Sequence, residues 1–279
     1  MKSDKIIIDP NLSSFFSFKE VLRFKSLLIN LAKRDFLVRY KQAFAGIMWA
    51  LIKPLINILV FGFIASKINS SENTATNFVY VASAMSLWQL FSTVFNDVSN
   101  SIIGNSNLFS KVYFPKIIIP LSSIFVCLVD FLISLIILVV LFIASGQTLH
   151  WQIIFAPLFI LLTLINGLGI GLYFATINVK YRDIKFIVPV IIQIGMYVSP
   201  VIFPTLYYIN AIHIPENMQW LMFLNPMVGA IEGFKYCLFG GEMVFEIWYY
   251  GVSVAVSMLM LFIGIKYFYK FERNFVDYI

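Results

Sequence analysis

The chain alternates between long apolar runs and short polar segments. Six runs are long enough to cross the hydrocarbon core of a bilayer, which takes about 20 residues at 1.5 Å each. They extend approximately from Phe44 to Ile68, Phe78 to Phe95, Ile117 to Ser145, Trp151 to Asn178, Phe186 to Phe203 and Ile247 to Phe268. The pattern predicts an all-α integral membrane protein with six transmembrane helices, because helices satisfy their own backbone hydrogen bonds in lipid.

The segment before the first run is basic and amphipathic. Residues 1–43 carry nine Lys or Arg and no uninterrupted apolar core, so we expect a cytoplasmic segment without a signal peptide. Between Val21 and Arg34, apolar residues share one helical face, and all the basic residues except Lys25 share the other. This pattern predicts a helix in the cytoplasmic interface, held by apolar burial and anionic headgroups.

The region 204–246, between the fifth and sixth runs, is apolar but interrupted. Asn225, Pro226, Glu232 and Lys235 break the stretch that would otherwise suggest a seventh span. A seventh crossing would also place the basic C-terminal residues outside the cell, against the positive-inside rule. We therefore expect two external half-helices, about 216–224 and 227–239, that enter the membrane and return. Irregular backbone at that depth must line protein or a water-filled cavity.

Composition and charge agree with this topology. Hydrophobic residues make up 60% of the 279 positions and charged residues only 12%, against about 25% charged in soluble domains. This balance excludes a nucleic-acid-binding domain and an ordinary cytosolic enzyme. Of the 20 basic residues, 17 fall on segments assigned to the cytoplasm and two on external ones. Both termini are thus expected in the cytoplasm, with 44–279 forming the six-span domain and 96–116 its cytoplasmic loop.

Catalytic and metal-binding signatures are missing from the sequence. It contains no phosphate-loop, dinucleotide-binding or zinc-protease motif, and its two cysteines have no metal-site spacing. The chain is therefore not expected to be an enzyme.

Two ionisable residues fall within predicted spans. Lys53 either extends to the cytoplasmic interface or has a functional role, and Asp130 is expected to face the bundle interior, paired or hydrogen-bonded. For Asp130, a structural contact and a role in a transport pathway remain open. Asp97, Asp130 and Asp183 are far apart in sequence, so we expect these carboxylates to be scattered.

Several short motifs together resemble a known family. They are Arg39-Tyr40-Lys41-Gln42 with Gly46, Trp49 and Pro54; Leu108 to Lys116 with Pro120; Tyr181-Arg182-Asp183-Ile184; Ser199-Pro200-Val201; and Asn225-Pro226-Met227. In this order they resemble the membrane subunits of ABC-type polysaccharide exporters, the Wzm-like proteins that move O-antigen, capsule or teichoic acid chains.

The resemblance implies a permease that works as a homodimer in the cytoplasmic (inner) membrane of a bacterium. Its substrate would be a lipid-linked polysaccharide, and its other contacts would be membrane lipids rather than nucleic acid. Two copies of a separate cytoplasmic ATPase would bind ATP and Mg, so no cofactor is expected in this chain.

The resemblance also suggests roles for individual residues. The contacts with the ATPase would involve Leu108, Phe109, Lys111, Tyr113, Arg182 and Asp183, and the external gate Asn225, Pro226 and Glu232. Four basic residues at the cytoplasmic mouth could bind the phosphate of the lipid-linked glycan, with Arg39 the first candidate, followed by Arg34, Lys33 and Lys41. Retention of positive charge in the cytoplasm and contact with lipid would also explain these charges.

Two alternatives remain open. The first is an ABC-type exporter of a small drug or lipid, because fold alone does not fix the substrate. The second is an integral-membrane transferase that acts on lipid-linked sugar, which would need Asp, Glu or His clustered at one membrane face.

Overall fold

The computed structural model describes residues 18–41, 48–68, 74–109, 114–241, 243–272 and 275, and this part of the chain contains helices and no strands. The N-terminal third forms α1 (Phe18–Arg23), α2 (Lys25–Lys41), α3 (Met48–Ile68), α4 (Thr74–Gly104) and α5 (Ser106–Phe109). Then come α6 (Ile118–Ala144), the 3-10 helix η1 (Trp151–Phe155), α7 (Ala156–Lys180) and α8 (Ile184–Val198). The chain ends with α9 (Thr205–Ile212), the 3-10 helix η2 (Glu216–Leu224), α10 (Pro226–Phe239) and α11 (Ile247–Glu272).

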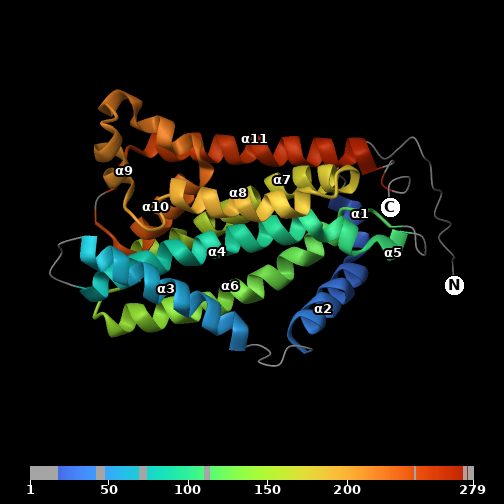
Figure 1. Ribbon diagram of the computed structural model, residues 1–279, viewed down its shortest axis with the longest axis horizontal. Helices are drawn as coiled ribbons and strands as arrows, with labels where there is room; N and C mark the ends of the chain where they lie inside the picture. The colour runs from blue at the N-terminus through green and yellow to red at the C-terminus, as the bar shows by residue number, and fades with distance from the viewer. Residues whose placement is uncertain are drawn as a thin grey trace.

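The long helices run side by side in one bundle (Figure 1). Within the described residues, four helices are long and apolar enough to span a membrane: Thr76–Gly104, Ile118–Ala144, Trp151–Lys180 and Ile247–Glu272. The helix Ile184–Val198 is also apolar but shorter. A helical, multi-pass membrane protein is therefore confirmed.

Close helix contacts in the bundle depend on glycines. Gly167 and Gly171 of α7 pack against Val94 and Val98 of α4, where an added Cβ would come within 2.8 and 2.7 Å of the valine side chains. On another face of α7, a Cβ at Gly264 of α11 would come within 2.1 Å of the Gly169 carbonyl oxygen. Only a residue without a side chain lets these two backbones approach so closely.

The second predicted span is longer than its apolar run. We predicted an end near Phe95, yet α4 continues to Gly104 and takes in part of the loop expected at 96–116. Polar side chains in this extension bond to the helix's own carbonyl groups, as Ser99 does to Asn96 O and Ser101 to Val98 O. A polar stretch that looks like a loop can therefore remain helical where neighbouring helices cover it.

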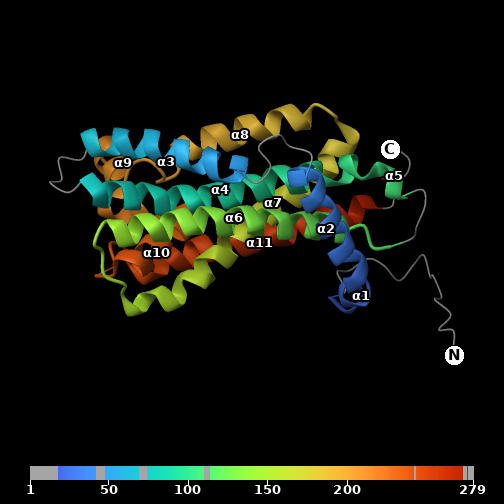
Figure 2. The same ribbon diagram turned by 90° about the horizontal axis from the view of Figure 1, so that it is seen from below.

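The N-terminal amphipathic helix differs from its prediction in the partner of its apolar face. α2 extends to Lys41, and it crosses the bundle obliquely (Figure 2). Leu28 and Leu31 are buried against Phe114, Ile118 and Ile119 at the start of α6. We expect this face to lie on lipid, but in the structure Leu28 and Leu31 pack on protein. This packing attaches α2 to the bundle.

The region 204–246 agrees with the prediction of two helical pieces, with α9 in addition. η2 and α10 match the expected 216–224 and 227–239, although η2 is a 3-10 helix. α9 and α10 lie together at the end of the bundle where α8 ends and α11 begins (Figure 1). The region between α8 and α11 therefore starts and finishes at the same end of the bundle.

Candidate functional site

Arg39 connects three helices of the bundle. From the last turn of α2, its Nη1 donates a 2.6 Å hydrogen bond to Asp130 Oδ2 of α6, and its Nη2 bonds to Asp97 Oδ2 of α4. Cys127 Sγ lies 3.4 Å from the same Asp97 oxygen. Asp97, Asp130 and Arg39, here called the latch cluster, join the interface helix to two long helices of the bundle.

The latch cluster carries more negative than positive charge. Two carboxylates share one guanidinium, and the second Asp130 oxygen is buried without a hydrogen-bond partner. Burial acts to lower the pKa of Arg39, but Asp97 and Asp130 outweigh it and raise that pKa above its ordinary value. Arg39 therefore stays cationic, and one of the two carboxylates is not balanced by charge within the cluster.

This geometry confirms one prediction and corrects another. Asp130 is buried and paired, as the sequence indicated. The expectation that Asp97 and Asp130 are scattered is wrong, because α4 and α6 are neighbours and bring them to one guanidinium. Asp97 and Asp130 are isolated charges among neutral or apolar neighbours in the sequence, and such carboxylates need a cation nearby, a signal that could have suggested a basic partner.

The other three basic candidates differ in their partners. Arg34 binds its neighbour Asp35 at 2.6 Å and also Asn105 at the end of α4. Lys33 and Lys41 are exposed, and neither forms an ion pair with the described residues. The two guanidinium groups are thus engaged within the protein, whereas the two ammonium groups are available to an external anion.

Lys53 belongs to a second polar feature. It lines a cavity of about 150 Å³ between α3, α4 and α8, with Pro54, Trp88 and Met196 among the walls. The other polar groups of this cavity, here called the polar groove, are Asn57, Ser86, Gln89, Ser92 and Thr93. We did not predict the α4 members, although hydroxyl and amide residues at helical spacing within an apolar span are a usable signal.

Four of the six expected ATPase contacts fall within the described residues. Leu108 packs against the apolar cluster that α2 and the start of α6 form with Leu28, Leu31 and Ile118. Arg182 and Asp183 are exposed in the turn between α7 and α8. Phe109 ends α5, and Lys111 and Tyr113 lie outside the described residues.

Two of the residues expected at the external gate mark the start of α10. Asn225 caps α10 by accepting a 3.1 Å bond from Met227 N, and it donates to Ser199 Oγ at 2.9 Å. Pro226 occupies the first helical position, where its missing N–H costs nothing. Asn225-Pro226 therefore marks the start of α10.

Glu232 lies inside α10, where its carboxylate is paired. Glu232 Oε1 accepts from Thr205 Oγ1 at 2.8 Å and from Lys235 Nζ at 3.3 Å. Lys235 also donates to Pro200 O at 2.9 Å and lies 3.9 Å from the centre of the Tyr80 ring. The described residues contain no group of three or more His, Cys, Asp or Glu that could hold a metal ion.

Similarity to known proteins identifies the class. A family model described as ABC-2 type transporter matches residues 26–239. The O-antigen export system permease protein RfbA of Myxococcus xanthus is 27% identical over 217 residues, which cover 78% of this chain and 82% of that protein. Two proteins of the same name from Klebsiella pneumoniae are 25% and 23% identical over 253 residues, which cover 90% of this chain and 94% of each. The resemblance inferred from the motifs is thereby confirmed: the chain belongs to the ABC-2 type transporter family and is a transport permease, not an enzyme.

Proposed function

We propose that this chain is one membrane half of an ATP-driven exporter that moves a lipid-linked polysaccharide out of the cytoplasm. The observation that carries the proposal is the polar groove, whose side chains can hydrogen-bond to sugar hydroxyls within an otherwise apolar bundle. The names of the relatives, all O-antigen export system permeases, support a glycan as the substrate.

The six crossings in this proposal are α3, α4, α6, α7, α8 and α11. At 15 residues, α8 is about 22 Å long, which is shorter than the hydrocarbon core. The helix ends at Val198, directly before Ser199-Pro200. The end with α2 and α5 faces the cytoplasm, and the end with α9 and α10 faces outward, in the inner membrane of a bacterium. The excess of basic residues toward the α2 end supports this orientation.

A second copy of the chain closes the groove in this proposal. α3 and α8 lie on the same side of the bundle (Figure 2). Apolar side chains on both helices are exposed, among them Leu59, Val60 and Phe63 of α3 and Val190, Ile194 and Val198 of α8. An apolar face on either side of a polar groove suits a homodimer, whose two grooves would face each other across a passage.

The energy comes from a separate ATPase, present in two copies, that binds ATP and Mg. Leu108, Arg182 and Asp183 are its proposed contacts. Leu108 packs against the cluster that holds Leu28 and Leu31 of α2. A displacement of α5 by the ATPase would therefore be transmitted to α2 and, through Arg39, to the latch cluster. Since Arg39 and Arg34 already have protein partners, Lys41 is now the better candidate for the phosphate of the substrate.

The groove is tested by changing its polarity without changing its size. Gln89→Leu in the full transporter should reduce the polysaccharide at the cell surface at least about fivefold, because the groove loses an amide that a sugar can bond to. Leu132→Met on the exposed face of α6 is the matched control and should leave export unchanged. Surface polysaccharide is measured by immunoblot of whole cells, with membrane levels of the protein checked in parallel. Normal export by Gln89→Leu would exclude the groove as the passage.

The orientation is tested separately by cysteine labelling. In a version with Cys127 and Cys237 replaced by serine, Thr148→Cys and Arg182→Cys each add one exposed thiol at opposite ends of the bundle. A membrane-impermeant maleimide should label only the first variant in intact cells and both after lysis. Labelling of Arg182→Cys alone would reverse the proposed topology.

A further inference from the structure

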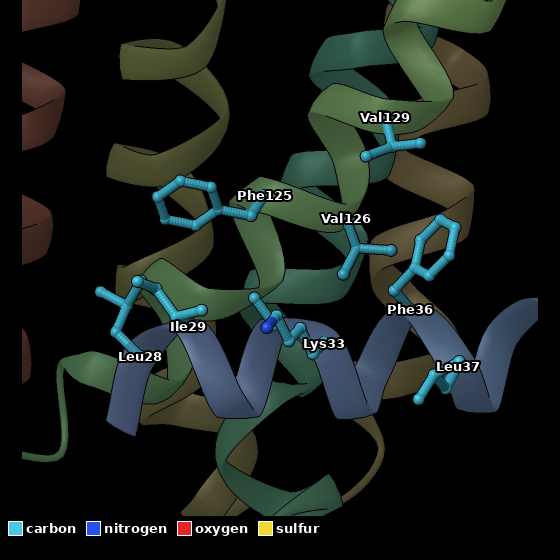
Figure 3. A pocket seen from close by; sticks show the side chains of 9 residues that line it. Leu28, Ile29, Lys33, Phe36, Leu37, Phe125, Val126 and Val129 are labelled. Carbon is cyan, nitrogen blue, oxygen red and sulfur yellow. The ribbon is translucent and has the colours of Figure 1, made fainter. Parts of the chain in front are cut away.

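We propose that the space between α2 and α6 binds an acyl chain of an anionic phospholipid, with the phosphate group held by Lys33. A cavity of about 450 Å³ lies there, within the range of ligand sites in proteins. Two helices line it, α2 with Ala32 and Phe36 among its residues and α6 with Phe125, Val126 and Val129 (Figure 3). Lys33 is the single charged residue among those that line it.

The cavity lies between two contacts that hold α2 against α6. On one side, Leu28 and Leu31 are buried against Ile118 and Ile119. On the other, Arg39 bonds to Asp130, the residue that follows Val129 of the cavity wall. Because α2 is held on both sides, it cannot simply move closer to α6 and fill the space.

The lining explains why the occupant is a hydrocarbon chain. An apolar cavity does not hold water well, and an empty one forfeits the dispersion contacts of its walls. Phe125 is 50% exposed at the cavity, and the outward face of α6 continues with Leu132, Ile136 and Val140, all exposed. In a membrane that continuous apolar face meets lipid, so a lipid tail can enter the cavity directly from the bilayer.

The charges explain why the headgroup is anionic. Lys33 lies at the cavity with no ion-pair partner among the described residues, unlike Arg34 and Arg39 on the same helix. Lys41 adds a second exposed ammonium group at the end of α2. A lipid with a net negative headgroup therefore gains an attraction that a zwitterionic lipid lacks. A lipid held there would be a third attachment for the helix that carries Arg39.

Photo-labelling of the full-length protein in vesicles tests this site. The protein is reconstituted in phosphatidylcholine with a trace of phosphatidylglycerol or phosphatidylcholine that carries a diazirine on its acyl chain, and labelled peptides are identified by mass spectrometry. We expect phosphatidylglycerol to label the α2 and α6 segments around Phe36 and Phe125 above the rest of α6. Uniform labelling along α6 would show ordinary lipid contact only and would overturn the proposal.

Two variants separate the tail from the headgroup. Ala32→Trp fills the cavity and should reduce labelling by both lipids at least about fivefold, whereas Val139→Trp on the exposed face of α6 should not. Lys33→Gln should reduce labelling by phosphatidylglycerol alone, by about fivefold, the effect of one basic residue near an anionic surface. Lys25→Gln is its control, because Lys25 is exposed on α2 and does not line the cavity.

Three other results of the labelling experiment would contradict the proposal. Equal labelling by the two lipids in the unmodified protein would show that Lys33 does not select an anionic headgroup. Cross-links between two copies at these residues would show that a second chain covers the cavity. Displacement of the label by a polyisoprenyl phosphate, but not by excess phosphatidylglycerol, would assign the site to the carrier of the exported glycan. Each of these results overturns the assignment to an anionic phospholipid and leaves the proposed export function standing.

Discussion

Two ion-pair clusters among the described residues of the bundle differ in how they are built. One is the Glu232–Lys235 pair in α10, which reaches Tyr80 near the start of α4, and the other is the latch cluster around Asp97. Tyr80 and Asp97 are 17 residues apart, or about 25 Å along α4. The ion pair of the first cluster lies within a single helix turn, whereas the ion pairs of the second join α2, α4 and α6.

The two clusters also differ in burial and in charge balance. The side chains of Lys235 and Glu232 are 4% and 7% exposed, and one ammonium group faces one carboxylate with further bonds to Pro200 and Thr205. In the latch cluster, the Arg39 side chain is 34% exposed and two carboxylates share it. A balanced, buried pair suits a fixed element, and an unbalanced cluster between separate helices suits one that rearranges. We infer that the α10 end of the bundle is the more rigid one and that the contacts of α2 with α4 and α6 rearrange during export.

The largest effect is expected from breaking the buried pair. Lys235→Met leaves the Glu232 carboxylate buried without its cation, which costs about 3–5 kcal/mol of stability. The variant should accumulate poorly in the membrane and unfold at a clearly lower temperature after purification in detergent.

A double variant is the control for this prediction. Glu232→Gln combined with Lys235→Met removes both charges, and replacing a buried pair as a whole is often close to neutral. We therefore expect the double variant to recover most of the lost stability. If Lys235→Met alone is as stable as the unmodified protein, the pair does not fix α10.

The second prediction concerns the latch and its effect on export. Arg39→Gln leaves Asp97 and Asp130 without a cation and removes one attachment of α2. We expect export to fall at least about tenfold while thermal stability falls by only about 1–3 kcal/mol, since the apolar contacts of α2 remain. Surface polysaccharide, measured against the amount of protein in the membrane, checks the first value, and thermal unfolding checks the second.

Two further variants distinguish the geometry of the Arg39 guanidinium group from the net charge of α2. Arg39→Lys keeps the charge but loses the planar guanidinium fork that reaches two carboxylates, so its export should be intermediate. Lys25→Gln changes the charge of the same helix at an exposed position and should have no effect. A loss of export with Lys25→Gln equal to that with Arg39→Gln would mean that only the net charge of α2 matters.

The sequence predicted features with local signals better than contacts between distant segments. Apolar length located the long helices, and Asn225-Pro226 located the start of α10, because both signals are local. The latch cluster escaped prediction because Arg39 and its two partners are 58 and 91 residues apart, and only the packing of α2 on α4 and α6 brings them together. For the same reason, periodicity identified the apolar face of α2 but could not distinguish protein from lipid as its partner.

A smaller effect is expected at the start of α10. Asn225→Ala removes the side chain that accepts from Met227 N, and the loss of such a cap costs about 1 kcal/mol. Asn225→Ser retains an acceptor and should lose less. Both are measured as shifts of the thermal midpoint in detergent. A larger loss with serine than with alanine would contradict the capping role.

The smallest effect should follow from correcting the charge imbalance of the latch. Asp130→Asn leaves one carboxylate for Arg39, and the amide oxygen of the new residue can still accept the bond from Nη1. The lost attraction is offset because a buried charge is removed, so we expect thermal stability to change by less than about 1 kcal/mol. Lys235→Met makes the opposite change at the other cluster, since it creates an unbalanced buried carboxylate instead of removing one. If Asp130→Asn proves as damaging as Lys235→Met, the latch is as rigid as the α10 pair, and the proposed difference between the two ends of the bundle is wrong.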